Sequence, residues 1–402
     1  MMLPEEVLRS LAIQTDSRLI LVVIDGLGGL PVRGKTELEA ANIPNLDRLA
    51  SKSTCGLIDP ISYGITPGSG PSHLALFGYD PLQYEIGRGV MEALGIDIPL
   101  TNDDLAARGN FATIDERGIV VDRRAGRIPT EKNREICDFL GNEIKEIEGV
   151  RISIYPGKEH RFVLVFRGEG LREDLADADP QKDGLKAKGT EGLSREARRT
   201  AEVVNLYLKK ANEVLRPFHP ANTILLRGFS KMPHIPTMSD RFKLRPAAIA
   251  TYPMYRGLAR LVGMETLKTG ETLQEEVEAL KKYFDRYDFF YIHFKKPDAA
   301  GEDGNYKMKV KAIEQIDRIL PSIFRMKPDV LAITGDHSTP TLLKSHSWHP
   351  NPILLFSKYV RPDGIRRFTE RHCQKGQLGR FPAKDVIPLM LANGLKLKKF
   401  GA

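Results

Sequence analysis

The chain has 402 residues, of which 41% are hydrophobic and 28% are charged, and its formal net charge is +8. A chain of this length exceeds one hydrophobic core and predicts about two to three domains, and its composition excludes a disordered or fibrous protein. Basic and acidic residues are interleaved along the whole sequence, so the excess charge favours a small anionic substrate over nucleic acid, although it could also serve solubility alone.

The N-terminal stretch 1–18 carries acidic and polar residues and lacks the basic and apolar regions of a signal peptide. No segment approaches the ~20 consecutive apolar residues that cross a bilayer. The three cysteines, Cys55, Cys137 and Cys373, lie far apart and form no CxxC pair, which argues against a disulfide framework or a zinc knuckle. We therefore expect a cytoplasmic protein without a membrane partner.

The first predicted strand, residues 19–24, is a short apolar run rich in branched side chains, and it ends at Asp25-Gly26. Ligand sites lie at such strand ends in parallel sheets. The carboxylate of Asp25 could bind a cation there, or it could cap the next helix.

The segment 64–71 is rich in glycine and proline, and it places Ser69 next to the start of an apolar helical run. The N-terminus of a helix favours anions. A serine hydroxyl there becomes a nucleophile if a base or a metal ion lowers its pKa. Ser69 is thus a candidate nucleophile, with a helix-capping serine in a flexible loop as the alternative.

The middle of the chain predicts a long helix at 194–215 and four short strands, 110–115, 118–122, 161–166 and 223–226. Strand-end acids occur on both sides of this region. We therefore expect a second α/β domain, residues 108–238, inserted into a first domain formed by residues 1–107 and 239–402.

The C-terminal part predicts strands at 289–294, 330–334 and 351–356 and helices at 273–284 and 308–323. Alternating strands and helices predict the α/β class. The acids and imidazoles near the ends of these strands are Asp298, Glu302, Asp336, His337, His346 and His349. Mixed carboxylate and imidazole ligands suit Mn, Zn or a related ion and can build a two-metal site, although each residue alone could belong to an ordinary turn or surface.

These features resemble those of the archaeal-type 2,3-bisphosphoglycerate-independent phosphoglycerate mutases, a family of the alkaline phosphatase superfamily. The matching motifs occur in family order over nearly the whole chain, at residues 25–28, 68–73, 77–81, 87–89, 92–95, 122–127 and 334–340. The resemblance implies an alkaline-phosphatase-like α/β domain that holds two divalent metal ions, Mn, Mg, Zn or Co. It also implies an inserted smaller α/β domain that closes over the substrate.

The resemblance further implies roles for individual residues, with Ser69 as the nucleophile that forms a phosphoserine. The implied ligands of one metal ion are Ser69, Asp25, Asp336 and His337, and those of the other are Asp298, His346 and the residue at position 302. The implied substrate-binding residues are Arg123, Arg124, Arg127, Arg161, Arg227 and Arg256. Guanidinium groups suit such oxyanions, although a solvated basic face is the alternative. Asp122 would orient the substrate hydroxyl or merely balance charge.

Three positions depart from the family pattern. Glu302 stands where the family has His, His349 where it has Asp, and Arg256 where Lys is common. Arg256 keeps the positive charge. We interpret Glu302 and His349 as a swapped carboxylate and imidazole that preserve both metal sites. The alternative is that Glu302 points into solvent and that one metal ion is weakly bound or absent.

The expected reaction interconverts 3-phosphoglycerate and 2-phosphoglycerate, as in glycolysis and gluconeogenesis, by two in-line transfers through Ser69 and without 2,3-bisphosphoglycerate. Failure to exclude water would instead make the protein a phosphatase. Another phosphotransferase of the superfamily and a catalytically impaired metal-binding homologue are further alternatives. The sequence leaves open which metal is bound and whether the chain forms a homo-oligomer.

Overall fold

The computed structural model describes residues 5–401 and divides into two compact units. The first unit comprises Met1–Glu85 and Ile235–Ala402, and the second comprises Ile86–His234. The second unit therefore begins before residue 108, and the substrate-binding role expected for residues 108–238 stays a prediction. Residues 1–4 lie outside the described residues. They belong to the N-terminal stretch 1–18, which was expected to lack the features of a signal peptide. Within the described part of the chain, no helix is long and apolar enough to span a bilayer.

The first unit is built on an eight-stranded sheet. In spatial order its strands are β10 (Glu265–Thr266), β9 (Pro246–Ile249), β11 (Phe289–Phe294), β1 (Leu19–Ile24), β12 (Val330–Thr334), β13 (Asn351–Ser357), β2 (Thr54–Asp59) and β14 (Gly379–Pro382). β1 pairs in parallel with both β11 and β12, whereas β13 runs antiparallel to β12 and β2. Every residue of β1, β11 and β12 is buried, as expected for strands that are covered on both faces. The carboxyl ends of these three strands consequently meet at one edge of the sheet.

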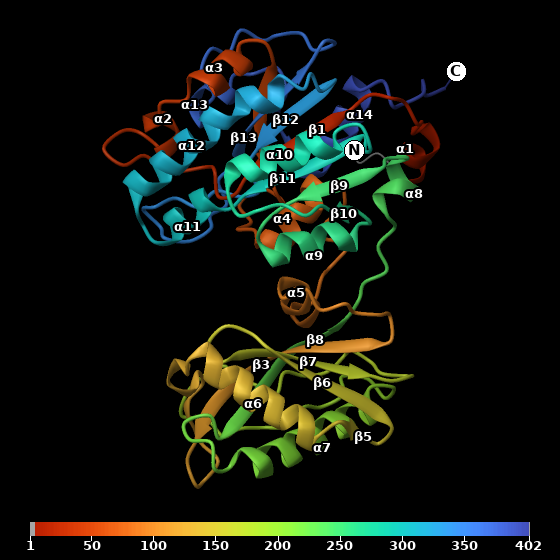
Figure 1. Ribbon diagram of the computed structural model, residues 1–402, viewed down its shortest axis with the longest axis vertical. Coiled ribbons are helices and arrows are strands. Elements are labelled where there is room, and N and C mark those ends of the chain that lie inside the picture. The colour runs from red at the N-terminus through yellow and green to blue at the C-terminus, as the bar shows by residue number, and fades with distance from the viewer. Residues whose placement is uncertain (1–4, 402) are drawn as a thin grey trace. The chain divides into compact units, whose positions relative to one another are not determined.

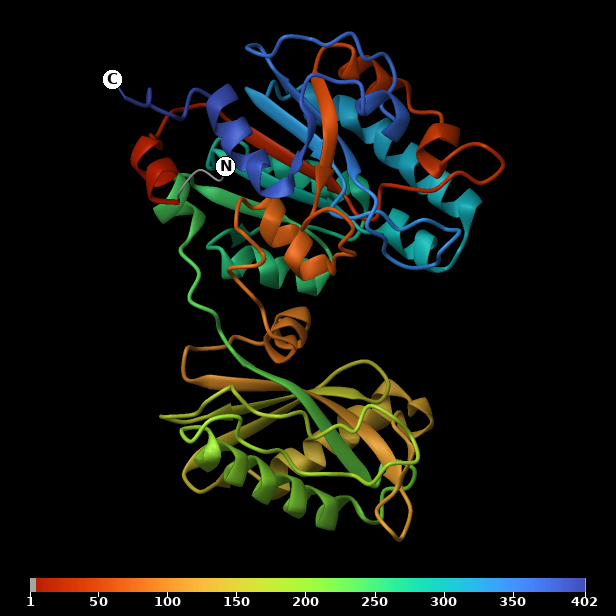
Figure 2. The same cartoon turned by 180° about the vertical axis from the view of Figure 1, so that it is seen from behind.

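Helices cover both faces of this sheet. They are α1 (Glu5–Leu11), α2 (Glu37–Ala40), α3 (Pro44–Ala50), α4 (Ser69–Leu76), α8 (Met238–Phe242), α9 (Pro253–Leu261), α10 (Leu273–Tyr283), α11 (Lys296–Glu302), α12 (Tyr306–Phe324), α13 (Glu370–Cys373) and α14 (Val386–Asn393), with a 3₁₀ turn at Ala383–Asp385. Ile20 and Val22 of β1 share a core with Val277 of α10 and Ile313 of α12. Figure 1 shows α10 and α12 along this face, and Figure 2 shows α14 and α4 on the opposite one.

The second unit is built on a six-stranded antiparallel sheet. Its strands are β4 (Val120–Asp122), β3 (Asp104–Ile114), β7 (Arg161–Arg167), β6 (Val150–Pro156) and β5 (Glu146–Ile147) in spatial order, with β8 (Thr223–Lys231) also paired to β3. α6 (Thr130–Glu143) and α7 (Arg198–Leu215) pack on one face of this sheet and share its core. Figure 1 shows α5 (Arg88–Gly95) on the other face. A 3₁₀ turn at Ala125–Arg127 follows β4.

The α/β class expected from the sequence is confirmed, and β1, β11 and β12 have the predicted bounds. Two elements of the second unit begin elsewhere than predicted. α7 begins at Arg198 and not at residue 194, because the Ser194 hydroxyl accepts the backbone N–H of Ala197 in a turn before the helix. β3 begins at Asp104, well before the predicted residue 110, because pairing with both β7 and β8 buries its first half without any alternation in the sequence.

Glu276, in the first turn of α10, is a buried acidic residue that is only 3% exposed. Acidic side chains are rarely buried to this extent without a charged partner. Burial raises the pKa of its carboxyl to about 8, and the nearby charge of Lys296 opposes only part of this shift. The folded state therefore holds this proton more tightly than the unfolded state, in which the pKa is 4.5. Stability contributed by the protonated carboxyl is fully present below the unfolded pKa and is lost as the pH rises through the folded one.

We expect Glu276→Gln to remove this loss, so that above about pH 8 the variant is more stable than the parent by on the order of a few kcal/mol. Urea unfolding at several values between about pH 6 and about pH 9 measures the free energy of unfolding of each protein. Glu278→Gln, at an exposed acid of the same helix, should behave like the parent. If the free energy of unfolding changed equally with pH in the parent and in Glu276→Gln, the expectation would be contradicted.

Candidate active site

Three fully buried carboxylates meet at the carboxyl ends of the parallel strands. Asp25 follows β1 directly, Asp336 is the second residue after β12, and Asp298 lies in α11 just after β11. Gly26, with a φ of 65°, makes the turn after β1, and a Cβ atom there would lie 2.7 Å from the Cα atom of Asp298. Only glycine tolerates both this conformation and this close approach. The parallel register of the strands thus brings together acids that lie far apart in the chain.

The carboxylates and two imidazoles form two overlapping groups with the spacing of metal ligands. Asp25, Asp336 and His337 form the first group, and Asp298, His337 and His346 form the second. Within each group, one ligand atom of each residue lies within 4.8 Å of the others. His337 Nε2 lies 3.4 Å from Asp25 Oδ1 and 3.1 Å from Asp336 Oδ2. His337 is therefore common to both groups. Its ring stacks on that of His346 with the centroids 3.6 Å apart.

The donor atoms of the first group fit a divalent cation. Among the described residues, Asp25 Oδ1 and Asp336 Oδ2 are buried oxygens without a hydrogen-bond partner, a costly condition that a bound cation relieves. The other oxygen of Asp336 accepts the backbone N–H of Gly26 at 3.1 Å, which fixes the carboxylate plane. Burial alone would lower the pKa of His337, but Asp336 and Asp25 outweigh it and raise this pKa to about 9. The group therefore attracts positive charge, and its oxygen and nitrogen donors suit Mn, Zn or a related ion.

Ser69 lies beside the first group. It is the first residue of α4, and its Oγ is 3.4 Å from His337 Nε2. One turn later, His73 Nδ1 donates to the backbone oxygen of Ser69 at 2.8 Å. Burial lowers the pKa of His73 to about 4, so its ring is neutral near pH 7 and can make this bond without carrying a charge. The serine hydroxyl is thus presented to the acids and imidazoles from the N-terminus of a helix.

The second group lies at a more open edge. His346 Nδ1 donates to the backbone oxygen of Pro67 at 2.9 Å, which leaves Nε2 directed toward the acids. His346 Nε2 is 3.8 Å from Asp298 Oδ1 and 3.8 Å from Glu302 Oε1. The Glu302 side chain is 54% exposed and is not a member of either group of converging ligands. Glu302 therefore adjoins the second group without being enclosed by it.

His349 lies outside both groups. Its Nδ1 is 3.0 Å from the Ser347 hydroxyl, and its ring stacks on the half-exposed Trp348 with centroids 4.9 Å apart. Burial lowers the pKa of His349, so the ring is neutral near pH 7. The structure thus places Glu302 near His346 but does not bring His349 to the same point.

Three further side chains, which the sequence analysis missed, hold the second oxygen of Asp25. Asp25 Oδ2 accepts the Tyr255 hydroxyl at 2.6 Å and lies 3.0 Å from His293 Nε2 and 3.2 Å from Lys295 Nζ. Lys295 Nζ also donates to Asp298 Oδ2 at 2.6 Å, so it joins an acid of each group. His293 lies within the apolar strand β11 and Lys295 directly after it. A polar residue at such a place could have marked both as candidate site residues. Nothing in the sequence marks Tyr255.

The second unit gathers guanidinium groups on its sheet. Arg108 of β3 is paired in register with Arg227 of β8, while Arg161 begins β7 and Arg88 begins α5. Burial lowers the pKa of Arg108 to about 10, and the charges of Arg227, Arg161 and Arg88 act in the same direction against that of Glu92. An anion bound among these groups would relieve their repulsion. The sequence analysis missed Arg108 and gave no role to Arg88.

Arg123 belongs to the same region of the second unit. Its Nε and Nη2 atoms donate to the two oxygens of Asp179 at 3.0 and 2.7 Å, and Arg227 Nε lies 3.9 Å from that carboxylate. Asp179 is buried, so it offsets part of the local positive charge. This fork geometry holds the Arg123 guanidinium in one orientation.

The other members of the basic run are exposed. Asp122 Oδ1 accepts the backbone N–H of Arg124 at 2.8 Å, and its Oδ2 accepts that of Gly126 at 2.6 Å. Asp122 therefore stabilises the turn that follows β4. Arg124 and Arg127 are exposed on this turn.

Arg256 lies in the first unit, on α9, where Nη1 donates to the backbone oxygen of Thr251 at 3.1 Å beside a cavity of about 460 Å³.

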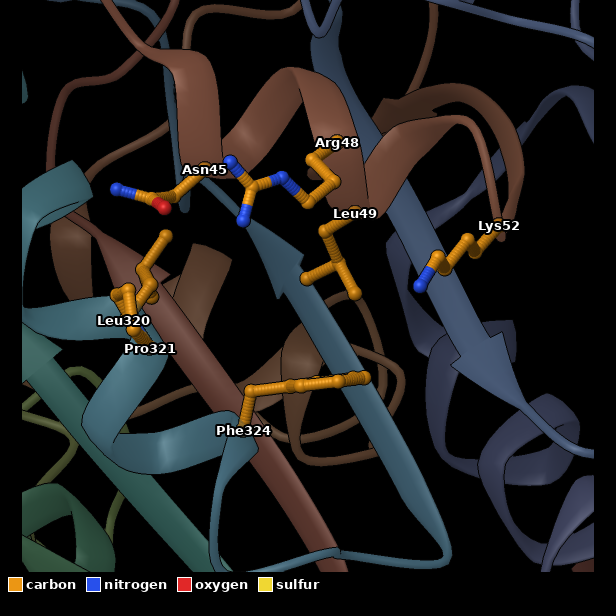
Figure 3. A pocket seen from close by; sticks show the side chains of 7 residues that line it. All are labelled: Asn45, Arg48, Leu49, Lys52, Leu320, Pro321 and Phe324. Carbon is orange, nitrogen blue, oxygen red and sulfur yellow. The ribbon is translucent and has the colours of Figure 1, made fainter.

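A smaller cavity of about 90 Å³ lies between α3 and α12, as Figure 3 shows. Its lining residues are Asn45, Arg48, Leu49, Lys52, Leu320, Pro321 and Phe324. This lining contains no carboxylate, imidazole or nucleophile and shares no residue with the two ligand groups, so the smaller cavity is not the chemical centre.

A family model described as 2,3-bisphosphoglycerate-independent phosphoglycerate mutase matches residues 50–222. A protein of Aquifex aeolicus named probable 2,3-bisphosphoglycerate-independent phosphoglycerate mutase is 53% identical over 99% of this chain and 100% of its own. A Thermotoga maritima protein of the same name is 52% identical over 99% of each chain. Among solved structures, the PH0037 protein from Pyrococcus horikoshii has 32% identity and a TM-score of 0.81 over 96% of this chain and 100% of its own. The cofactor-independent phosphoglycerate mutase from Thermoplasma acidophilum has 31% identity and a TM-score of 0.77 over 94% and 100%.

We expect the protein to bind Mn²⁺, and Asp25→Asn to bind it roughly tenfold or more weakly, because the change removes a charged oxygen donor from the first group. Calorimetric titration of chelator-treated protein measures the affinity, and the fluorescence of Trp348, the only tryptophan of the chain, gives a second readout. Asp303→Asn, at an exposed acid just beyond α11, serves as the control. Parent-like affinity in Asp25→Asn would show that the first group is not a metal site.

Proposed function

The chain belongs to the 2,3-bisphosphoglycerate-independent phosphoglycerate mutase family, and on that premise we propose that it interconverts 3-phosphoglycerate and 2-phosphoglycerate through a phosphoserine at Ser69. The observation that carries this proposal is the position of Ser69 Oγ, at the N-terminus of α4 and 3.4 Å from His337 Nε2 of the first ligand group. A nucleophile, a cluster of candidate metal ligands and a helix N-terminus that favours phosphate therefore coincide.

In the first transfer, the bond between phosphorus and the 3-oxygen breaks while a bond to Ser69 Oγ forms. The hydroxyl proton of Ser69 is passed to the leaving 3-oxygen, so the glycerate that forms carries a 3-hydroxyl group and stays bound. The glycerate then turns within the site. In the second transfer its 2-oxygen attacks the phosphoserine, and the 2-hydroxyl proton returns to the serine oxygen. Water must be kept from the phosphoserine during the turn, since attack by water would give a phosphatase.

The residues of the two groups would hold two divalent ions, for which Mn, Mg, Zn and Co are candidates. The proposed ligands are Asp25, Asp336, His337 and Ser69 for one ion and Asp298, His346 and Glu302 for the other. When bound, such ions lower the pKa of the serine hydroxyl and offset the charge of the phosphoryl group. His73 contributes from the protein side, because its bond to the backbone oxygen of Ser69 fixes the first turn of α4.

Arginines are proposed to bind the carboxylate and phosphate of the substrate. They are Arg123, Arg124, Arg127, Arg161 and Arg227 of the second unit and Arg256 of the first. Since both carboxylate oxygens of Asp122 accept backbone N–H groups, we propose that Asp122 holds the turn and balances charge instead of orienting the substrate hydroxyl. A cytoplasmic location belongs to the same proposal, in keeping with the buried free thiols of Cys55, Cys137 and Cys373.

We expect Ser69→Ala to lower mutase turnover by roughly a thousandfold or more, because it removes the phosphoryl acceptor. Conversion of 3-phosphoglycerate is followed with enolase as the coupling enzyme, without added 2,3-bisphosphoglycerate, while inorganic phosphate is measured in parallel. Ser62→Ala, at an exposed serine of the preceding loop, is the matched control. Mass spectrometry of the quenched parent should locate phosphate on Ser69.

Substantial mutase turnover in Ser69→Ala would exclude Ser69 as the acceptor. Phosphate release by the parent without isomerisation would identify a phosphatase of the same family.

Glu302 is proposed to take the place of the imidazole that the family pattern implies at this position. Its approach to 3.8 Å from His346 Nε2 supports this assignment. Compensation by His349 requires the His349 ring to leave the Ser347 hydroxyl, to which Nδ1 now lies at 3.0 Å.

A true exchange of roles between these two residues predicts that Glu302→His and His349→Asp each weaken binding of the second Mn²⁺ equivalent and lower turnover. It also predicts that the double variant recovers both, which is the signature of coupled sites. Metal content after gel filtration and kcat are the measurements. Parent-like metal content and turnover in His349→Asp alone would refute the compensation and leave Glu302 as an independent ligand.

A further inference from the structure

The hydroxyl of Tyr255 lies between two charged groups of the candidate active site. Tyr255 is fully buried in α9, and its hydroxyl donates to Asp25 Oδ2 at 2.6 Å. Lys295 Nζ donates to the same hydroxyl at 3.2 Å. One phenolic oxygen therefore contacts a candidate metal ligand and the lysine that joins the two ligand groups.

The bond to Asp25 decides where the other oxygen of that carboxylate points. The two oxygens of a carboxylate share a rigid plane, so holding Oδ2 fixes the direction of Oδ1. Oδ1 is buried without a partner among the described residues and lies 3.4 Å from His337 Nε2. Partners that orient a metal ligand in this way commonly control metal affinity.

The ring of Tyr255 is itself held in place by aromatic contacts. It stacks on His293 with centroids 3.7 Å apart and packs against His73 at 4.6 Å. The ring is thus held where its hydroxyl donates to Asp25 Oδ2.

We propose that Tyr255 is a positioning residue for phosphoryl transfer, whose hydroxyl aims Asp25 Oδ1 at the first cation position. The part that concerns phosphoryl transfer rests on the function proposed above, whereas the part that concerns Asp25 rests on the geometry of the ligand group alone. Tyr255 is a better subject for a test than Lys295, because removing its hydroxyl changes no charge.

Tyr291 provides a matched control. It is also fully buried, and its ring belongs to the same aromatic cluster, 5.7 Å from His73 and 4.9 Å from Phe77. Its hydroxyl, however, has no hydrogen-bond partner among the described residues. Tyr291→Phe therefore deletes the same atom from the same environment without removing a contact to a ligand.

The experiment compares Tyr255→Phe, Tyr291→Phe and the parent. Mn²⁺ affinity is measured on chelator-treated protein by calorimetry and by Trp348 fluorescence, and kcat and KM for 3-phosphoglycerate are measured at saturating Mn²⁺. We expect Tyr255→Phe to bind Mn²⁺ roughly tenfold more weakly and to lose roughly 10–100-fold in kcat, with KM changed less than about threefold. Tyr291→Phe should match the parent in all three quantities, and thermal unfolding should show that both variants are folded.

Mn²⁺ affinity in Tyr255→Phe equal to that of Tyr291→Phe would overturn the role assigned toward Asp25. Weaker binding with an unchanged kcat at saturating Mn²⁺ would overturn the role assigned in phosphoryl transfer. If the parent itself shows no mutase turnover, the proposed function fails, yet the Mn²⁺ titrations still decide whether Tyr255 positions Asp25.

Discussion

The mutual repulsion of three buried carboxylates is the constraint on which the first unit depends. Asp25, Asp298 and Asp336 are fully buried at one edge of the sheet, where an ionised acid is costly unless donors or cations surround it. Burial acts to raise the pKa values of Asp25 and Asp336, but histidine and other neighbouring donors lower both, so these acids stay ionised. The parallel strands hold the charges in place, and a slip of one residue in the pairing of β1 would turn Asp25 to the other face.

In the second unit, the clustered charges that need compensation are positive. Its sheet concentrates guanidinium groups around Arg108, and burial there lowers the pKa of that arginine to about 10. The buried carboxylate of Asp179 compensates part of this charge through its fork with Arg123. What remains is a surplus of positive charge suited to a phosphorylated acid. The candidate metal ligands and most of the clustered arginines thus belong to two units with separate cores.

The acids at the strand ends could be predicted because each follows a short apolar run, and such a run predicts both a buried strand and the place where it stops. The neighbours of these acids depend on packing between helices and strands, which no local pattern reports. Tyr255 lies in an ordinary amphipathic helix, and its role arises only because α9 brings the ring onto His293. The spacing of Glu302 and His349 in the sequence likewise could not show that one adjoins His346 while the other rests against Ser347.

His337 belongs to both groups of candidate ligands, although it is proposed as a ligand of the first ion alone. A replacement of His337 would remove a donor from the first position and, because its ring stacks on that of His346, would also change the surroundings of the second. Glu302, at the exposed end of α11, adjoins the second group only. A substitution of Glu302 can therefore change the second position while leaving the donors of the first in place.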